Sequence, residues 1–320
     1  MKTTHDSLGR RRRDIPRSTG KHIRLGNRDL LWLQKLHAHG PLSSSYLYQF
    51  AKPIWPNEQA NIRRLGDLFH EGRYLDRPAP QFETLDPRHN PLVYDLTLVS
   101  DKILKDNHLY SEHSPTPAAS FRHWKHRFMT SCITASIELA TIANPKLRYI
   151  PQSEILGKLN APLRIPITIK NPLTRKKEKR DLIPDAIFAI EYKYPEGKKY
   201  LAFFLEADRN TEPNRSYNFE RKSYRRTILQ YRELISQKLY KSHYGLNAGA
   251  LVLNVTTSHT HMENLIELTK ELSFHNRNNF MLYQGLPDFG YPFKPPPPLL
   301  NLITDPWKRA GRDPFHINKP

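Results

Sequence analysis

The sequence has almost no cysteine and no long apolar run. Its 320 residues contain one cysteine, Cys132, which excludes an intrachain disulfide and any zinc site built from several cysteines. No apolar stretch approaches the roughly 20 residues that span a bilayer, and residues 1–26 lack the apolar core of a signal peptide. We therefore expect no membrane insertion and a location in a bacterial-type cytoplasm.

Two common catalytic motifs are also missing, and acidic residues are in the minority. The absence of a Walker-type phosphate loop and of a G-x-S-x-G elbow disfavours intrinsic ATP use and serine hydrolase chemistry. The chain has 50 Lys and Arg against 31 Asp and Glu, a net charge of +19. This surplus favours a polyanionic partner, because each phosphate contact releases counterions. Double-stranded DNA is the leading candidate, although an anionic membrane surface attracts the same charge.

The length and the composition predict about two domains with basic or proline-rich connections. Residues 1–26 contain eight Lys or Arg and show no apolar periodicity, so we expect a mobile basic arm. A first domain is predicted over residues 27–106, a linker over 107–118 and a second domain over 119–290. Residues 291–320 are too rich in proline for regular structure, which predicts a tail that lies on the surface or binds another chain.

The first domain is predicted to be a winged helix-turn-helix. Helix-stop signals and the spacing of apolar residues predict helices over 27–39, 43–50 and 57–71. Two strands follow, at 73–75 and 92–96, joined by a proline-rich loop. In such a module the third helix enters the major groove of DNA and the hairpin contacts the backbone.

The third helix supplies the candidate DNA contacts of this domain. We expect Ile62, Leu65 and Leu68 to be buried and the polar side chains to lie on the other faces. Because amide and guanidinium groups suit base edges, the candidates are Asn57, Gln59, Asn61, Arg63 and Arg64. Arg88 and His89 are candidates for phosphate contacts at the tip of the wing. The alternative is a solvated helix face, or a winged helix that docks onto another protein.

The second domain alternates helices and strands. We expect, in chain order, a helix at 121–141, a strand at 147–150, two apolar strands between 182 and 208, a helix at 216–240, a strand at 246–255, a helix at 261–273 and a strand at 280–283. This order places several strands beside one another, with helices on their faces.

Carboxylates gather where the two central strands meet. Asp185 opens the first of them, and Glu206 and Asp208 close the second on one strand face. Mg²⁺ prefers oxygen ligands and is commonly held by one or two carboxylates, which Asp185 and Glu206 supply, with the carbonyl of Ala207 as a further ligand. The alternative is that these acids cap the next helix or pair with surface Lys and Arg. Glu206 directly follows the apolar residues LAFFL, so either a metal ion or a cationic side chain has to compensate its charge.

These motifs resemble a known superfamily and a known family. The element order, Pro184-Asp185 and Glu206-Ala207-Asp208 resemble the restriction-endonuclease-like PD-(D/E)xK superfamily. A winged helix followed by a strand that ends in E-x-D-x-x-T-E, here residues 206–212, resembles the replication-relaxation family of plasmids and other mobile elements, over roughly residues 27–255. The resemblance implies an α+β chain: an N-terminal winged helix-turn-helix, then a restriction-endonuclease-like mixed sheet flanked by helices, with Mg²⁺ or Mn²⁺ as cofactor.

The sequence departs from the superfamily pattern at Asp208, where a lysine usually stands. Asp208 is then a third metal ligand, or a cation from the next helix replaces the lysine, or the site no longer cuts DNA. We favour Lys222 for that cation, because Arg226 and Tyr231 share its face of a helix. Basic side chains around the site are candidates for phosphate contacts: Arg225, Arg226, Lys176 and Lys177.

The resulting hypothesis is a DNA-binding protein of a plasmid or other mobile element that nicks or cleaves DNA with magnesium. A double-strand cut needs two sites and favours a homodimer, whereas a nick needs one; other mobile-element proteins are further candidate partners. One alternative is a non-catalytic regulator or accessory factor with a degenerate nuclease domain. Another is a relaxase that uses His259 and His261 to hold a metal ion while a tyrosine attacks DNA, although this short motif lacks its usual context.

Overall fold

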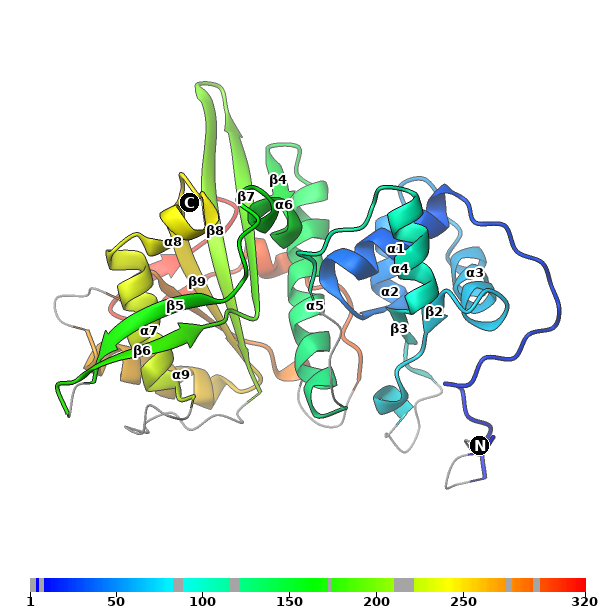
Figure 1. The fold of residues 1–320 in the computed structure, drawn as a ribbon, viewed down its shortest axis with the longest axis horizontal. Helices are drawn as coiled ribbons and strands as arrows, with labels where there is room; N and C mark the ends of the chain where they lie inside the picture. Colours follow the sequence, from blue (N-terminus) through cyan, green and yellow to red (C-terminus); the bar gives the residue numbers. More distant parts are fainter. Residues whose placement is uncertain are drawn as a thin grey trace. The chain divides into compact units, whose positions relative to one another are not determined.

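The chain forms two compact units in the computed structural model (Figure 1). Unit 1 comprises residues 1–135 with 291–298, and unit 2 comprises residues 136–290 with 299–320. The division falls inside the long helix α5, Phe121–Ile142. The structure describes residues 4–5, 9–82, 89–115, 121–171, 174–209, 222–273, 278–289 and 294–320.

Unit 1 combines helices with a small antiparallel sheet. Its described elements are α1 (Asn27–His39), β1 (Leu42–Ser43), α2 (Ser44–Ala51), α3 (Glu58–His70), β2 (Leu75–Asp76), β3 (Val93–Leu96) and α4 (Leu98–Asp106). The strands lie in the order β1-β3-β2. Trp32, Leu47 and Leu68 are fully buried between the helices, as expected for apolar residues at helical spacing. The predicted helices and the strand predicted at 92–96 are confirmed. The strand predicted at 73–75 shares only Leu75 with β2, because Arg73 has a positive φ of 50°. Strand β1 and helix α4 were not predicted.

Two predictions about unit 1 are wrong. The first is the solvent-facing position of Asn61, which is fully buried, while Ile62 is 38% exposed. The Asn61 amide donates hydrogen bonds to the carbonyls of Trp55 and Asn57, at 2.8 and 2.7 Å. These carbonyls belong to the turn before α3 and need a donor when buried. The second is the burial of Ile62. Residues 17–24 of the arm hydrogen bond to α3 and to its C-cap Glu71, and the mobility of the rest of the arm stays a prediction.

Unit 2 is built on a mixed sheet. Its strands are β4 (Leu147–Ile150), β7 (Ala186–Tyr194), β8 (Gly197–Asp208), β9 (Gly249–Thr256), β10 (Met281–Gly285), β11 (Trp307–Arg309) and β12 (Arg312–Phe315). They lie in the order β12-β11-β10-β9-β8-β7-β4. The β8–β9 and β9–β10 pairs are parallel, and the other pairs are antiparallel.

Helices and a hairpin cover one face of this sheet (Figure 1). They are α6 (Gln152–Gly157), the hairpin of β5 (Ile165–Lys170) and β6 (Lys177–Leu182), α7 (Tyr224–Ser236), α8 (Leu239–Tyr244) and α9 (His259–Glu271). Ile187 and Phe204 face the core beneath them. Phe188 and Phe203 alternate with these residues and therefore point to the opposite face, where their rings stack at 5.2 Å.

The predicted strands and helices of unit 2 are largely confirmed, with some differences. The helix predicted at 216–240 is two helices, α7 and α8, separated at Lys238, which has a positive φ of 54°. Residues 216–221 lie outside the described part of the chain. Strand β5 and helix α6 were not predicted. In the described residues no helix combines the length and the apolarity that crossing a bilayer requires.

The C-terminal segment also differs from its prediction. Residues 307–309 and 312–315 form β11 and β12, so the expected lack of regular structure is wrong there. Trp307 is fully buried, and its indole N–H donates to the Leu302 carbonyl at 2.8 Å. Proline is tolerated because Pro306 stands just before β11 and Pro314 lies in the edge strand β12.

Candidate functional site

Asp185, Glu206 and Asp208 lie at the same end of β7 and β8. The backbone N–H of Asp185, the residue before β7, donates to the Leu205 carbonyl at 3.0 Å, which brings Asp185 beside the end of β8. One Asp185 carboxylate oxygen accepts a hydrogen bond from the Ala207 N–H at 2.7 Å. Because side chains alternate along a strand, Glu206 and Asp208 share the face of Phe204, which α7 and α9 cover.

Glu206 is buried between a hydroxyl group and a cation. Its side chain is 8% exposed, and the Tyr231 hydroxyl donates to Oε1 at 2.6 Å. The Lys222 ammonium lies 3.6 Å from Oε2. Burial raises the pKa of Tyr231 well above its ordinary value, and the negative charge of Glu206 raises it further. Tyr231 therefore stays protonated and stabilises the buried carboxylate as a hydrogen-bond donor, while Lys222 compensates its charge.

Asp208 is paired with a histidine of α9. Its Oδ2 lies 2.7 Å from His261 Nε2, and both side chains are 12% exposed. His261 reaches this position because β9 runs parallel to β8, with Thr256 beside Asp208, and α9 begins three residues later. His259 and His261 are two residues apart on a helix, in which each residue turns by about 100°, so they point to nearly opposite sides of the helix. They do not form the paired site that a relaxase needs.

A row of polar side chains continues from Glu206 across the sheet. The strand register places Asn254 beside Glu206 and Tyr283 beside Asn254. The Tyr224 hydroxyl donates to the Asn254 side-chain oxygen at 2.7 Å and lies 3.3 Å from the Tyr283 hydroxyl. Glu206, Asp208, Lys222, Tyr224 and Asn254 line a small hollow at this point.

His261, Asn254 and Tyr224 also belong to this site, and the sequence did not predict them there. Asn254 left a recognisable signal, because it interrupts the apolar strand sequence ALVLNVT. The position of His261 depends on the parallel pairing of β8 with β9, which joins residues far apart in the chain. Within the described residues there is no group of three or more His, Cys, Asp or Glu side chains arranged to hold a metal ion.

Some candidate DNA contacts of α3 are exposed, whereas others are buried or bonded to other groups of the protein. Gln59 and Arg63 are exposed. Asn57 is exposed as a residue and caps α3, its side-chain oxygen accepting from the Ala60 N–H at 2.9 Å. Arg64 is half-buried and forms a two-pronged ion pair with Asp29 at 3.0 and 2.6 Å. Asn61 is buried, so its predicted contact with DNA is withdrawn.

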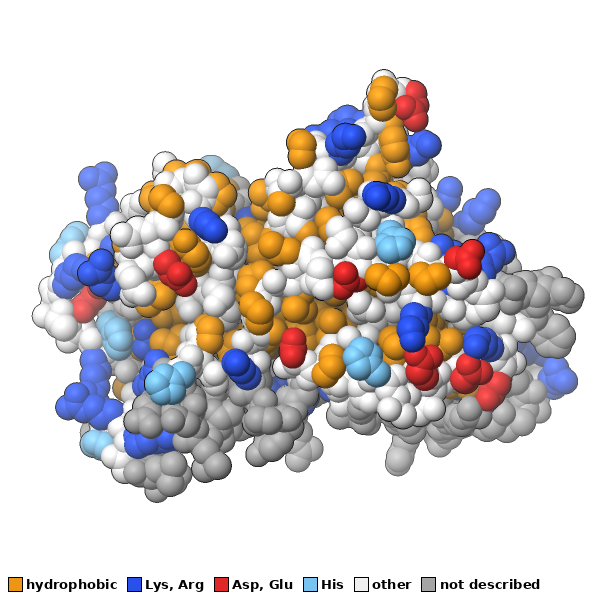
Figure 2. Space-filling view, turned by 180° about the vertical axis from the view of Figure 1, so that it is seen from behind, with side chains coloured by type: hydrophobic (Ala, Val, Ile, Leu, Met, Phe, Trp, Pro, Cys, Tyr) orange, Lys and Arg blue, Asp and Glu red, His pale blue; other side chains and the backbone are white. Residues whose placement is uncertain are grey.

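The remaining basic candidates also differ in their exposure to solvent. Lys176 and Lys177 are exposed at the start of β6, and Arg226 is half-buried on α7. Arg225 is only 6% exposed, which contradicts its predicted position on the surface. Arg88 lies outside the described residues. In Figure 2, Lys and Arg side chains gather along the margin of unit 1 at which Figure 1 draws α3.

Comparison with known protein families identifies the chain. The family model described as Replication-relaxation matches residues 33–249, more than half of the sequence. The chain belongs to the replication-relaxation family. Neither a search of curated proteins nor a search of solved structures found a significant match.

The replication-relaxation match covers the acidic site but not all of its neighbours. Asp185, Glu206, Asp208 and Lys222 lie inside the matched range, whereas His261 lies beyond it. Residues 210–212 of the E-x-D-x-x-T-E motif are outside the described structure. Membership of the replication-relaxation family indicates a role in the replication or mobilisation of plasmids or other mobile elements, and it implies interaction with DNA.

Proposed function

We propose that this replication-relaxation protein binds double-stranded DNA and nicks or cleaves it with the help of Mg²⁺ or Mn²⁺. The observation that carries the proposal is that Asp185 hydrogen bonds to the backbone on both sides of Glu206, with the Lys222 ammonium 3.6 Å from the Glu206 carboxylate. Phosphodiester cleavage requires charge shielding at phosphate, an activated water and a stabilised leaving oxygen. Paired carboxylates beside a lysine suit that chemistry.

The donor chemistry fits one divalent ion better than a larger metal cluster. Asp185 and Glu206 supply two carboxylates, and Mg²⁺ is commonly held by one or two while water and substrate phosphate complete its shell. Asp208 is engaged by His261 at 2.7 Å, so we assign the ion to Asp185 and Glu206. When bound there, the ion supplies charge neutralisation at the phosphate and a more acidic water.

The chain's own groups prepare the site for this chemistry. Tyr231 holds Glu206 by a hydrogen bond of 2.6 Å and fixes the direction of its second oxygen. Lys222, whose side chain is 42% exposed, can reach a phosphate oxygen while it remains close to Glu206. It thereby takes over the role of the lysine that Asp208 replaces.

The order of the elements supports the fold assigned to each unit. In unit 1, a helix, a short strand, two helices and two strands in the order β1-β3-β2 are consistent with a winged helix-turn-helix. In unit 2, the order α5, β4, β7, β8, α7, β9 and the sequence β4-β7-β8-β9 within the sheet are consistent with a restriction-endonuclease-like fold.

A second candidate function is DNA binding without cleavage. Among the described residues, no three or more His, Cys, Asp or Glu side chains are grouped so that they could hold a metal ion. Each of the three carboxylates also has a hydrogen-bond donor or a cation beside it. Both observations favour this function. The protein then uses both units to bind DNA as a regulator or accessory factor.

Nicking of supercoiled plasmid separates the two functions. With MgCl₂ we expect wild type to convert supercoiled into open-circular DNA, and with EDTA we expect none. Asp185→Asn and Glu206→Gln each remove a charge without changing the shape of the side chain, and we expect each to slow nicking at least about 100-fold.

Glu191→Gln is the matched control for both variants. Glu191 is a buried glutamate of the same sheet, with the Tyr200 hydroxyl at 3.0 Å and the Lys198 ammonium at 3.2 Å. It lies away from the proposed site, so Glu191→Gln is expected to nick like wild type. Wild type that binds plasmid but never cuts it, or Asp185→Asn and Glu206→Gln variants as fast as wild type, rejects the proposed cleavage.

A further inference from the structure

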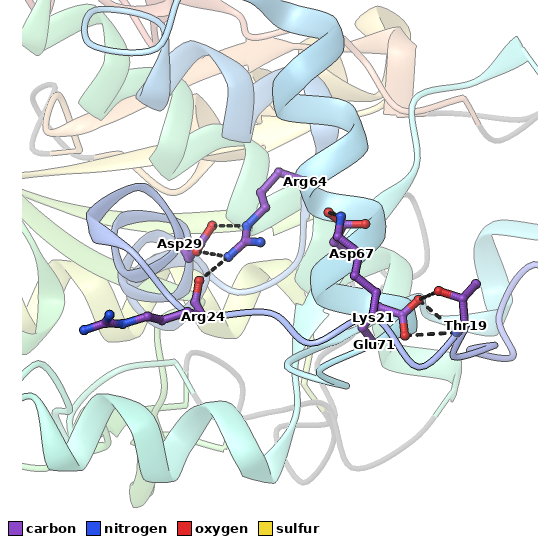
Figure 3. A network of polar contacts seen from close by, with 7 residues as sticks. All are labelled: Thr19, Lys21, Arg24, Asp29, Arg64, Asp67 and Glu71. Carbon is purple, nitrogen blue, oxygen red and sulfur yellow. Dashed lines mark hydrogen bonds and ion pairs between the residues drawn. The ribbon is translucent and has the colours of Figure 1, made fainter.

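The N-terminal arm is attached to one face of α3 (Figure 3). Arg64, Asp67 and Glu71 are spaced by three and four residues, so they lie above one another on the helix. We call them the arm-binding face. The Ser18 hydroxyl donates to Glu71 at 2.6 Å, and the Thr19 N–H and hydroxyl donate to the same carboxylate at 3.0 and 2.9 Å.

Further contacts follow along the helix toward its N-terminus. The Lys21 ammonium lies 2.6 Å from the Asp67 carboxylate, and the Arg64 guanidinium donates to the Arg24 carbonyl at 2.7 Å. The hydrogen bonds from Ser18 and Thr19 lower the pKa of Glu71 to about 2. Glu71 is therefore ionised at neutral pH. Residues 17–24 follow the helix, and we call them the strap.

This attachment changes the charge that α3 presents to its surroundings. Asp67 and Glu71 alone would repel DNA phosphates from the C-terminal half of the helix. The arm contacts both carboxylates and brings its own cations, because residues 9–24 contain seven Lys or Arg and one Asp. Arg17 and Arg24 are exposed, and Figure 3 shows the Arg24 side chain pointing away from α3.

The exposed part of α3 remains open beside the strap. Gln59 and Arg63 are exposed and do not belong to the arm-binding face. At the start of α1 a shallow hollow is lined by Arg24, Arg28, Arg64 and Trp55, among other residues. Of the three arginines at this hollow, Arg24 comes from the end of the arm, Arg28 from the first turn of α1 and Arg64 from α3.

We propose that residues 17–24 and α3 form one surface for duplex DNA, in which the exposed Arg17 and Arg24 contact phosphates beside the groove that α3 enters. The inference rests on the proposed DNA binding by unit 1, and it does not depend on cleavage. A basic strap held by helix carboxylates attracts DNA to the helix, whereas an acidic strap would exclude it.

The test is binding of a fluorescently labelled DNA duplex in EDTA, measured by anisotropy at increasing NaCl. Arg17→Ala/Arg24→Ala removes two phosphate contacts, and we expect at least tenfold weaker binding at low salt. We also expect the slope of log affinity against log salt to fall by about 1.8, since each contact contributes about 0.9. Arg312→Ala/Lys319→Ala removes the same charge from exposed positions of unit 2 and is expected to match wild type.

A second variant tests whether attachment of the strap helps or hinders binding. Ser18→Ala/Thr19→Val removes two hydroxyl donors to Glu71 without changing any charge. We expect about fivefold weaker DNA binding, because the loosened strap no longer holds its arginines beside α3. Tighter binding would mean that the strap blocks α3, and it would overturn the inference.

The possible failures are distinguishable. Wild type that binds duplex DNA while Arg17→Ala/Arg24→Ala binds equally well, or weakens no more than Arg312→Ala/Lys319→Ala, rejects the arm as part of the surface. Wild type that binds no duplex rejects the DNA-binding function itself, and the inference with it. EDTA keeps metal-dependent cleavage out of both measurements.

Discussion

Replacement of Trp307 by alanine is expected to lower the free energy of unfolding of unit 2 by about 3 to 5 kcal/mol. Trp307 is fully buried in β11, and its indole N–H donates to the Leu302 carbonyl at 2.8 Å. The variant leaves a cavity and an unpaired carbonyl where the C-terminal segment joins the sheet. Urea unfolding, followed by far-ultraviolet circular dichroism so that the signal does not depend on the mutated tryptophan, measures the change.

Lys308→Ala is the control for this loss of stability. Lys308 is the next residue of β11, is exposed, and pairs with an exposed glutamate, Glu263. Surface pairs of this kind contribute about 0 to 1 kcal/mol, so the control is expected to unfold close to wild type. If Trp307→Ala unfolds at the same urea concentration as Lys308→Ala, the C-terminal strands do not belong to the stable core of unit 2.

Replacement of Lys222 by methionine is expected to slow DNA nicking about 100- to 1,000-fold, the usual effect of losing one well-placed stabilising group. Lys222 lies 3.6 Å from Glu206 and brings a positive charge to a site whose strand position carries Asp208 in place of lysine. Methionine keeps most of the length of the side chain, so folding and DNA affinity should change little. Single-turnover nicking rates at saturating protein measure the chemical step.

Lys198→Met provides the matched comparison for Lys222→Met. Lys198 pairs with the buried Glu191 at 3.2 Å, so it has the same chemistry in the same sheet without belonging to the proposed site. We expect wild-type rates from this variant. Equal rates for Lys222→Met and Lys198→Met would show that Lys222 only neutralises Glu206 and takes no part in cleavage.

Local patterns in the sequence were sufficient for most elements and for the acidic cluster. Strand alternation alone places Glu206 and Asp208 on one face, and Asp185, directly before the antiparallel strand β7, brings its carboxylate to the same end. The helical position predicted for Lys222 is wrong, because Lys222 precedes Ser223, the N-cap of α7. Its ammonium nevertheless lies 3.6 Å from Glu206, beside the Tyr231 hydroxyl that donates to the same carboxylate.

Features that depend on distant residues or on individual backbone groups could not be predicted in this way. Asn61 looks like a surface residue by type, yet two buried turn carbonyls require its amide. The pairing of His261 with Asp208 depends on which strands are neighbours. The C-terminal prediction failed because average proline content conceals where each proline stands, and Pro306 and Pro314 occupy positions that a strand tolerates.

The central claim is that Asp185 and Glu206 hold one divalent ion, and anomalous scattering from crystals grown with Mn²⁺ and duplex DNA tests it most directly. We predict one anomalous peak in unit 2 between the Asp185 and Glu206 carboxylates, and its loss in a crystal of the Asp185→Asn/Glu206→Gln variant. Crystals in which DNA lies against these residues and no anomalous peak appears between them would contradict the claim.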